Sequence, residues 1–344
     1  MRIAITTDAW SPQINGVVTT LQQTRDELVR QGNEVCMITP EGRRSMPCPT
    51  YPEIRLTLFA GSQIARELDA FDPECVHVAT EGPIGLIVRR YCIKRSLPFT
   101  TPYHTQFPEY VRARFPIPLS WTVALLRWFH GAADRTMVPT RSIRKVLEDR
   151  RFENVVIWER GVLTDVFKPD DPVEYNLAGP IWVYVGRVSV EKNIGGFLDL
   201  GLPGTKMIIG DGPDRKRLAK RYPDCEFPGY RFGRELARSL AGCDVFVFPS
   251  KTDTFGIVML EAMACGLPVA AFPVTGPIDV VRPGETGILD NDLKLACERA
   301  LDLDPTACRK YAESRSWTRS TEQFVSHLTP KGGVAHPASG QHLA

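Results

Sequence analysis

Short apolar segments and longer amphipathic segments alternate along most of the chain, and this alternation starts twice. The first series opens with "RIAITTD" at residues 2–8 and continues with a helical pattern over 17–31. The second opens with "IWVYVGR" at residues 181–187 and includes "CDVFVFPS" at 243–250. Apolar runs of this length separated by helices are typical of parallel strands covered on both faces. The chain therefore predicts an α/β fold with two doubly wound, Rossmann-like parallel sheets.

The length fits two domains. A chain of 344 residues exceeds what a single core usually supports. The segment 166–179 contains two prolines and two adjacent aspartates between the two series, which favours a linker. We expect one domain over residues 1–168 and another over 169–314. Residues 331–344 have few apolar groups to bury, so we expect them to be disordered.

The charge is unevenly distributed. The formal net charge is +2, yet residues 85–168 hold 15 Lys or Arg against 7 Asp or Glu, a net of +8. A basic region of this kind suggests an anionic partner, either lipid headgroups or nucleic acid. A solvated basic face with no partner is the alternative, and it stays open at this point.

The lack of a recognisable targeting signal and the spacing of the cysteines together suggest a cytoplasmic protein. No apolar run approaches 18 residues, and the N-terminus lacks the long apolar stretch of a signal peptide. The nine cysteines include no CxxC pair, so we expect reduced thiols and no zinc site.

Ligands of doubly wound sheets bind at the carboxyl ends of the strands, which directs attention to the loops there. One such loop, "GRVSVEKN" at residues 186–193, carries Arg187 and Lys192 close to the expected start of a helix. Two cations in this position could hold a diphosphate. The alternative is a pair of ordinary surface cations. A P-loop is excluded because the chain has no GxxxxGK[ST] motif.

A second strand-end loop carries two acids. Asp253 and Glu261 are eight residues apart in "DTFGIVMLEAMACGLPVA". On one straight helix they would be about 80° and about 12 Å apart, too far to act as a paired general acid and base. They could hold the two ends of an extended ligand, with free backbone N–H groups between them. The alternative is a helix capped by Thr252 or Asp253, with Glu261 partly exposed.

As a set, these motifs resemble retaining glycosyltransferases of family 4, which have the GT-B fold. The acid-containing segment is similar to the family's Glu-seven-Glu motif. "GRVSVEKN", "GDGP" at 210–213 and "CDVFVFPS" occur in the family's order. The resemblance implies that residues 1–168 bind the acceptor and that 169–314 bind a nucleotide sugar. It also implies a helix near 315–330 that packs back on the first domain.

The resemblance assigns a role to each site residue. It implies no metal and no cofactor other than the nucleotide-sugar co-substrate, and it implies transfer with retention by front-face attack. Asp253 stands where the family more often has Glu. The residues expected to act on the transferred sugar and leaving group are His104, Asp253, Arg187 and Lys192. Those expected to bind the nucleotide sugar are Gly16, Arg187, Lys192, Phe255, Gly256, Ile257 and Glu261.

The expected acceptor follows from residues 112–135, where arginines alternate with Trp and Leu. This mixture fits an interfacial helix facing anionic lipid. The alternative is a helix that buries its Trp and Leu side chains. The arginines of this segment are Arg112, Arg114, Arg127 and Arg135.

Together with a likeness to bacterial glucosyl-, glucuronosyl- and sulfoquinovosyl-diacylglycerol synthases, the segment predicts transfer from UDP-glucose or UDP-glucuronic acid to diacylglycerol. The reaction would take place at the inner face of the cell membrane, with the protein attached peripherally. The alternatives are a phosphatidylinositol mannosyltransferase and a soluble-acceptor transferase, each using GDP-mannose. A nucleic-acid-binding protein is disfavoured because the recognition motifs of such modules are absent from the sequence.

Overall fold

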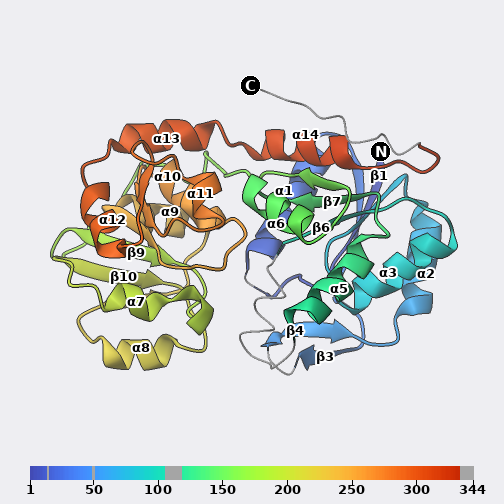
Figure 1. Ribbon diagram of the computed structural model, residues 1–344, viewed down its shortest axis with the longest axis horizontal. Coiled ribbons are helices and arrows are strands. Elements are labelled where there is room, and N and C mark those ends of the chain that lie inside the picture. Colours follow the sequence, from blue (N-terminus) through green and yellow to red (C-terminus); the bar gives the residue numbers. More distant parts are fainter. Residues whose placement is uncertain (14, 49–50, 105–117, 334–344) are drawn as a thin grey trace. The chain divides into compact units, whose positions relative to one another are not determined.

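The computed structural model describes residues 1–344 apart from 14, 49–50, 105–117 and 334–344 (Figure 1). The chain divides into two compact units. Unit 1 comprises Met1–Glu159 and Ser320–Ala344, and unit 2 comprises Arg160–Arg319. Each unit is built around one six-stranded parallel sheet, which confirms the predicted α/β class.

The sheet of unit 1 has the order β2-β1-β5-β6-β7-β8, so the chain reverses its direction of winding between β1 and β5. Its strands are β1 Arg2–Thr6, β2 Glu34–Ile38, β5 Cys75–Val78, β6 Thr100–Pro102, β7 Arg135–Val138 and β8 Val155–Ile157. Its helices are α1 Gly16–Arg30, α2 Gly61–Phe71, α3 Pro83–Lys94, α5 Leu119–His130, α6 Arg141–Asp149 and most of α14 Trp317–His327. A hairpin of β3 Ser45–Cys48 and β4 Tyr51–Thr57 is added to this unit.

The sheet of unit 2 has the order β11-β10-β9-β12-β13-β14, and here the winding reverses between β9 and β12. Its strands are β9 Ile181–Val185, β10 Thr205–Ile209, β11 Glu226–Gly229, β12 Val245–Phe248, β13 Val269–Ala271 and β14 Gly287–Leu289. Its helices are α7 Ile194–Leu198, α8 Arg215–Arg221, α9 Gly233–Ala241, α10 Ile257–Ala264, α11 Pro277–Val280, α12 Leu293–Ala300 and α13 Pro305–Glu313, together with a 3-10 turn at Val190–Lys192.

Strand β9 shows why the sheet of unit 2 needs helices on both faces. All five of its residues are buried. Trp182 and Tyr184 pack in one core cluster, and Ile181, Val183 and Val185 pack in the other. Alternate residues of a strand point to opposite faces, so an uninterrupted apolar run requires a cover on each side.

The second unit begins earlier in the chain than the boundary expected at residue 168. Val162 and Phe167 are buried in the core of unit 2. The Arg309 guanidinium also donates to the carbonyl oxygens of Phe167 and Thr164, at 2.6 and 3.2 Å. Residues 160–168 therefore belong with the second sheet, because their side chains and carbonyls find their partners there.

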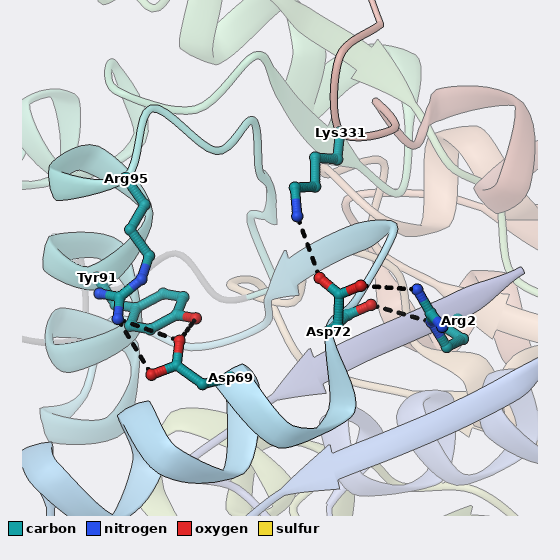
Figure 2. A network of polar contacts seen from close by, with 6 residues as sticks. All are labelled: Arg2, Asp69, Asp72, Tyr91, Arg95 and Lys331. Atoms are coloured by element: carbon teal, nitrogen blue, oxygen red, sulfur yellow. Dashed lines mark hydrogen bonds and ion pairs between the residues drawn. The ribbon is translucent and has the colours of Figure 1, made fainter.

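The chain returns to unit 1 through α14. Phe324 of this helix is fully buried beside Trp158, with ring centroids 4.9 Å apart. The expected disordered tail lies outside the described residues from 334 onward. Before that point the chain is still held, because the Lys331 backbone N–H donates to the Glu74 carbonyl at 2.7 Å. Its Nζ also donates to Asp72 at 3.1 Å, as Figure 2 shows.

Candidate active site

Two loops meet at the point of unit 2 where the winding reverses. They follow β9 and β12, and they contain residues 186–193 and 249–256. Asn193 links them, because its Nδ2 donates to the Pro249 carbonyl at 3.1 Å. Ligands of doubly wound sheets bind in the crevice at such a reversal. The motifs singled out from the sequence therefore lie where this fold places ligands.

Lys192 and Asp253 form an ion pair across these two loops. Lys192 Nζ lies 2.5 Å from Asp253 Oδ1, and the two side chains are 18% and 17% exposed. The structure thus brings together the cation expected at the diphosphate and the acid expected beside the sugar. Both side chains are well shielded from water, which strengthens the pair relative to a surface contact.

Several buried oxygens beside this pair make no hydrogen bond within the described part of the chain. They are the hydroxyls of Ser189, Ser250 and Thr252 and the second carboxylate oxygen of Asp253. A buried polar atom without a partner costs about 1–3 kcal/mol. Buried oxygens without partners, gathered on two adjacent loops, fit a site that binds a polar ligand.

Helix α10 begins after Asp253, not at it. Gly256 is the residue before the helix, has a φ of +82°, and makes no side-chain cap bond. A Cβ there would lie 2.8 Å from Phe248 Cζ and 2.9 Å from Met259 Cε, so both backbone and packing require glycine. The alternative of a helix capped by Thr252 or Asp253 is wrong, and the one-helix estimate of the separation of the two acids does not apply.

The N-terminus of α10 offers hydrogen-bond donors. The first backbone N–H groups of a helix have no partner within the helix and carry partial positive charge. Phe255 and Ile257, which flank Gly256, are both half-buried. The segment expected to present amides to a sugar diphosphate is therefore a tight turn followed directly by a helix.

Glu261 lies in the second turn of α10. The residue is half-buried, and burial of its carboxyl group raises the pKa to about 7. A carboxyl group with this pKa changes charge near neutral pH. Hydrogen bonds donated by ligand hydroxyls would favour its ionised form.

The "GDGP" segment supports the loop that carries Arg187. Gly210 and Gly212 have φ values of +143° and +159°, and a Cβ on them would lie 1.9 Å from the Gly186 oxygen and 2.3 Å from the Val188 oxygen. Only glycine allows the loops after β9 and β10 to run so close together. The half-buried Arg187 is held at this junction, where its carbonyl accepts a hydrogen bond from the Tyr184 hydroxyl at 3.1 Å.

Gly16 is the first residue of α1 in unit 1. Asn15 caps this helix by accepting from the backbone N–H groups of Val17 and Val18, each at 3.0 Å. A Cβ on Gly16 would meet no atom of the described residues within 4 Å. Packing inside the protein therefore does not require glycine at this position.

His104 follows β6 at the carboxyl edge of the unit 1 sheet. It is half-buried, and its ring centroid lies 6.1 Å from that of the buried Trp158. Gly16 and His104 belong to unit 1, whereas the remaining predicted residues belong to unit 2.

Asp8 is a polar residue at the winding reversal of unit 1 that the sequence motifs did not single out. It follows β1, and its carboxylate accepts from the Ile84 N–H at 3.0 Å and the Thr80 hydroxyl at 2.9 Å. Burial raises the pKa of Asp8 despite these bonds. A Cβ on Gly82 would lie 2.5 Å from the Asp8 carboxyl group. An acid directly after a buried strand was the available signal, and here it fixes the start of α3.

Two further findings concern metal ions and membrane spans. Over the described residues, no three His, Cys, Asp or Glu side chains are grouped so that they could hold a metal ion. Within the same residues, no helix is both long enough and apolar enough to cross a bilayer. Arg112 and Arg114 lie outside the described part of the chain.

Comparisons with known proteins agree with this geometry. A family model described as Glycosyltransferase Family 4 matches residues 14–166, and one described as glycosyl transferases group 1 matches residues 179–302. A GDP-mannose-dependent alpha-mannosyltransferase of Mycobacterium tuberculosis is 32% identical, covering 95% of this chain and 96% of that protein.

Two other relatives are named for sugars other than mannose. A sulfoquinovosyl transferase of Arabidopsis thaliana is 32% identical over 77% of this chain and 58% of that protein. An alpha-monoglucosyldiacylglycerol synthase of Streptococcus pneumoniae is 25% identical over 94% and 83%. Among solved structures, Anabaena HepE in complex with UDP and glucose has a TM-score of 0.68 at 15% identity, covering 94% of this chain and 98% of that one. The predicted GT-B fold is confirmed.

Proposed function

We propose that the acceptor of this chain, which belongs to glycosyltransferase family 4, is the hydroxyl group of diacylglycerol at a membrane surface. The chain is a hexosyltransferase that uses a nucleotide sugar as its donor. The protein would attach peripherally to the cytoplasmic face of the membrane. One of the relatives above supports a lipid acceptor, since it is named as an alpha-monoglucosyldiacylglycerol synthase.

The observation that carries this proposal is the exposed apolar face of α5. Trp121, Leu125 and Trp128 are 72%, 55% and 54% exposed. Their spacing of four and three residues places them on one side of the helix. Leu126 and Phe129 are buried instead. The alternative of a helix that buries its Trp and Leu side chains is therefore wrong for Trp121, Leu125 and Trp128. Exposed tryptophans beside arginine are typical of helices that lie in the headgroup region.

The proposed chemistry uses the loops of unit 2. The departing nucleoside diphosphate gains negative charge as the glycosidic bond breaks. Arg187, Lys192 and the first amides of α10 would stabilise that charge, and Glu261 would accept hydrogen bonds from the ribose. Asp253 and His104 would orient the transferred sugar. We propose that the acceptor hydroxyl attacks from the side of the leaving group, so that the anomeric configuration is retained. Its oxygen forms the new glycosidic bond as the bond to the diphosphate breaks, and its proton passes to the departing diphosphate oxygen.

The proposed donor is UDP-glucose or UDP-glucuronic acid. GDP-mannose is the second candidate, and a specific observation favours it. The mycobacterial relative, which is 32% identical over 95% of this chain, is named as a GDP-mannose-dependent enzyme. With this donor, phosphatidylinositol becomes an acceptor to be considered beside diacylglycerol.

The test is a matrix of donors and acceptors. Purified protein is incubated with UDP-glucose, UDP-glucuronic acid or GDP-mannose and with vesicles containing diacylglycerol or phosphatidylinositol, and the product masses are measured. The proposal expects a hexosylated lipid, with the anomeric configuration of the donor in its NMR spectrum. The Arg187→Ala variant is the control for enzyme-dependent product. Efficient transfer to a water-soluble acceptor with no lipid product would overturn the lipid assignment.

A further inference from the structure

We infer that α3 forms a second lipid-facing helix beside α5, and that the two helices make one docking surface for an anionic bilayer. This inference rests on the proposed lipid acceptor, and it extends the membrane contact to a helix that the sequence motifs did not single out. We call this surface the two-helix face. It consists of Leu86, Arg89, Arg90, Ile93 and Lys94 of α3 and Trp121, Leu125, Arg127 and Trp128 of α5.

Helix α3, like α5, has one exposed side that carries apolar and basic residues and one side that is buried in the core. Leu86 and Ile93 are 43% and 49% exposed, and they lie seven residues apart, hence two turns apart on one side. Arg90 and Lys94 are exposed on the same side. The opposite side packs in the core through Ile84, Val88, Tyr91 and Cys92.

Arg89 joins the two helices. Its Nε donates to the Phe129 carbonyl at 3.0 Å, and its Nη2 donates to the Trp128 carbonyl at 2.8 Å. The guanidinium carbon lies 3.9 Å from the Trp128 ring centroid, within the range of a cation–π contact. Arg89 is flanked by Leu86 and Ile93 at positions three before and four after it. Because those spacings share one side of a helix, the exposed residues of α3 lie next to the C-terminal end of α5. Figure 1 shows the two helices side by side.

The charge of the two-helix face selects anionic lipid. Neither Pro83–Lys94 nor Leu119–His130 contains an Asp or a Glu, and together they carry Arg89, Arg90, Lys94 and Arg127. The nearest acid before α3, Glu81, lies 3.2 Å from the His130 ring. Each cation near an anionic leaflet adds an attraction that salt screens, and buried Trp and Leu side chains add a part that salt does not screen.

The experiment compares three double variants of the full chain in sedimentation with vesicles of phosphatidylglycerol and phosphatidylcholine. They are Arg90→Glu/Lys94→Glu on α3, Trp121→Ser/Leu125→Ser on α5, and the charge-matched control Lys216→Glu/Lys220→Glu on α8, whose side chains are also exposed. We expect the α3 variant to lose about tenfold or more of its affinity for anionic vesicles at low salt, because each substitution removes one attraction to the headgroups and adds one repulsion. We expect the control to bind like the native protein. Affinity for the nucleoside diphosphate should be unchanged in the α3 variant, which confirms its folding.

The outcomes separate this inference from the proposed function. If the α5 variant releases the protein and the α3 variant binds normally, α3 is not part of the surface, and the lipid acceptor still stands. If the native protein ignores anionic vesicles at low salt, the two-helix face and the membrane part of the proposed function are both wrong. A change in self-association without a change in vesicle binding would identify the face as a contact between protein copies and overturn the inference.

Discussion

Lys192 Nζ lies 2.5 Å from Asp253 Oδ1, so the cation proposed to bind the diphosphate is already neutralised by the acid proposed to orient the sugar. An arriving diphosphate therefore competes with Asp253 for the same ammonium group. The second Asp253 oxygen is buried without a hydrogen-bond partner among the described residues, which makes the pair less stable than a fully satisfied one. Substitutions of Lys192 and of Asp253 should therefore have opposite effects on the affinity for the diphosphate.

Replacing Asp253 with Asn should tighten binding of the nucleoside diphosphate and lower turnover. The substitution removes the competing negative charge but also the acid that orients the sugar. We expect affinity to rise several-fold, a change of about 1 kcal/mol, measured by titration calorimetry with UDP and GDP. The Asp253→Glu variant, which keeps the charge and has the side chain that is more common in the family, should retain activity. Weaker binding in Asp253→Asn would contradict the competition between Asp253 and the diphosphate.

Replacing Lys192 with Ala should weaken binding of the same ligands. Loss of one charge-assisted hydrogen bond costs about 1.5–3 kcal/mol, or roughly ten- to 150-fold in the dissociation constant. Lys216→Ala, at an exposed position of α8, serves as the control. An unchanged dissociation constant for both UDP and GDP would remove Lys192 from the diphosphate site.

The positions of the donor loops could be predicted from the sequence, but their direct contact could not. Arg187 and Lys192 are close in sequence, and the turn before Ile257 is marked by Gly256, so local patterns suffice for both. The contact between Lys192 and Asp253 depends on the pairing of β9 with β12, in which Trp182 lies opposite Val245. That register is set by packing of the whole sheet, which no local pattern encodes.

Two features could not be settled from the sequence, and the physical reason is of the same kind in both. The sequence places the boundary between the domains at residue 168, yet Val162 and Phe167 are buried in unit 2. On α5, helical periodicity shows that Trp121, Leu125 and Trp128 share a side. It does not show that this side faces outward, because that depends on which neighbours cover Leu126 and Phe129.

Glu261 should make stability depend on pH near neutrality. Burial raises the pKa of its carboxyl group to about 7 from an ordinary value of 4.5. Between these values the folded state holds a proton that the unfolded state releases, so the free energy of unfolding falls as pH rises from about 4.5 to 7. The full effect is about 3 kcal/mol. Urea denaturation over this range should show a larger fall in the native protein than in Glu261→Gln, because Asp8, whose pKa burial also raises, contributes to both proteins.

A bound nucleotide sugar reports on the same carboxyl group. If ribose hydroxyls donate to Glu261, the ligand favours the ionised form, and affinity should increase as pH rises through about 7. A nucleotide sugar is used because its diphosphate carries no group that titrates in this range. A pH-independent affinity in the native protein, equal to that of Glu261→Gln, would place the ribose elsewhere.

Alanine at Gly16 and at Gly256 should have opposite effects on folding. Within the described part of the chain, a Cβ on Gly16 meets nothing within 4 Å, and the residue is helical, so Gly16→Ala should stabilise the fold by about 0.5–1 kcal/mol. Gly256→Ala has a positive φ and two contacts under 3 Å, so it should destabilise the fold by at least about 1–2 kcal/mol. If the backbone at Gly16 approaches the diphosphate, Gly16→Ala should also lower turnover despite its greater stability. Full activity in that variant would show that a side chain is tolerated there.

His104 should affect turnover more than nucleotide binding. It follows β6 at the carboxyl edge of the unit 1 sheet, half-buried beside Trp158, and the proposed function places it at the transferred sugar. A residue that touches only the sugar contributes to the transition state for transfer and little to the binding of a free nucleoside diphosphate. We therefore expect His104→Ala to lower kcat by about tenfold or more, the effect of about 1.4 kcal/mol, while the UDP or GDP dissociation constant stays constant. His104→Asn, which keeps a hydrogen-bonding group near the ring Nδ1 position, should recover part of the rate. Equal losses of turnover and nucleotide affinity, together with a lower free energy of unfolding, would instead mean that the ring serves only to pack against Trp158.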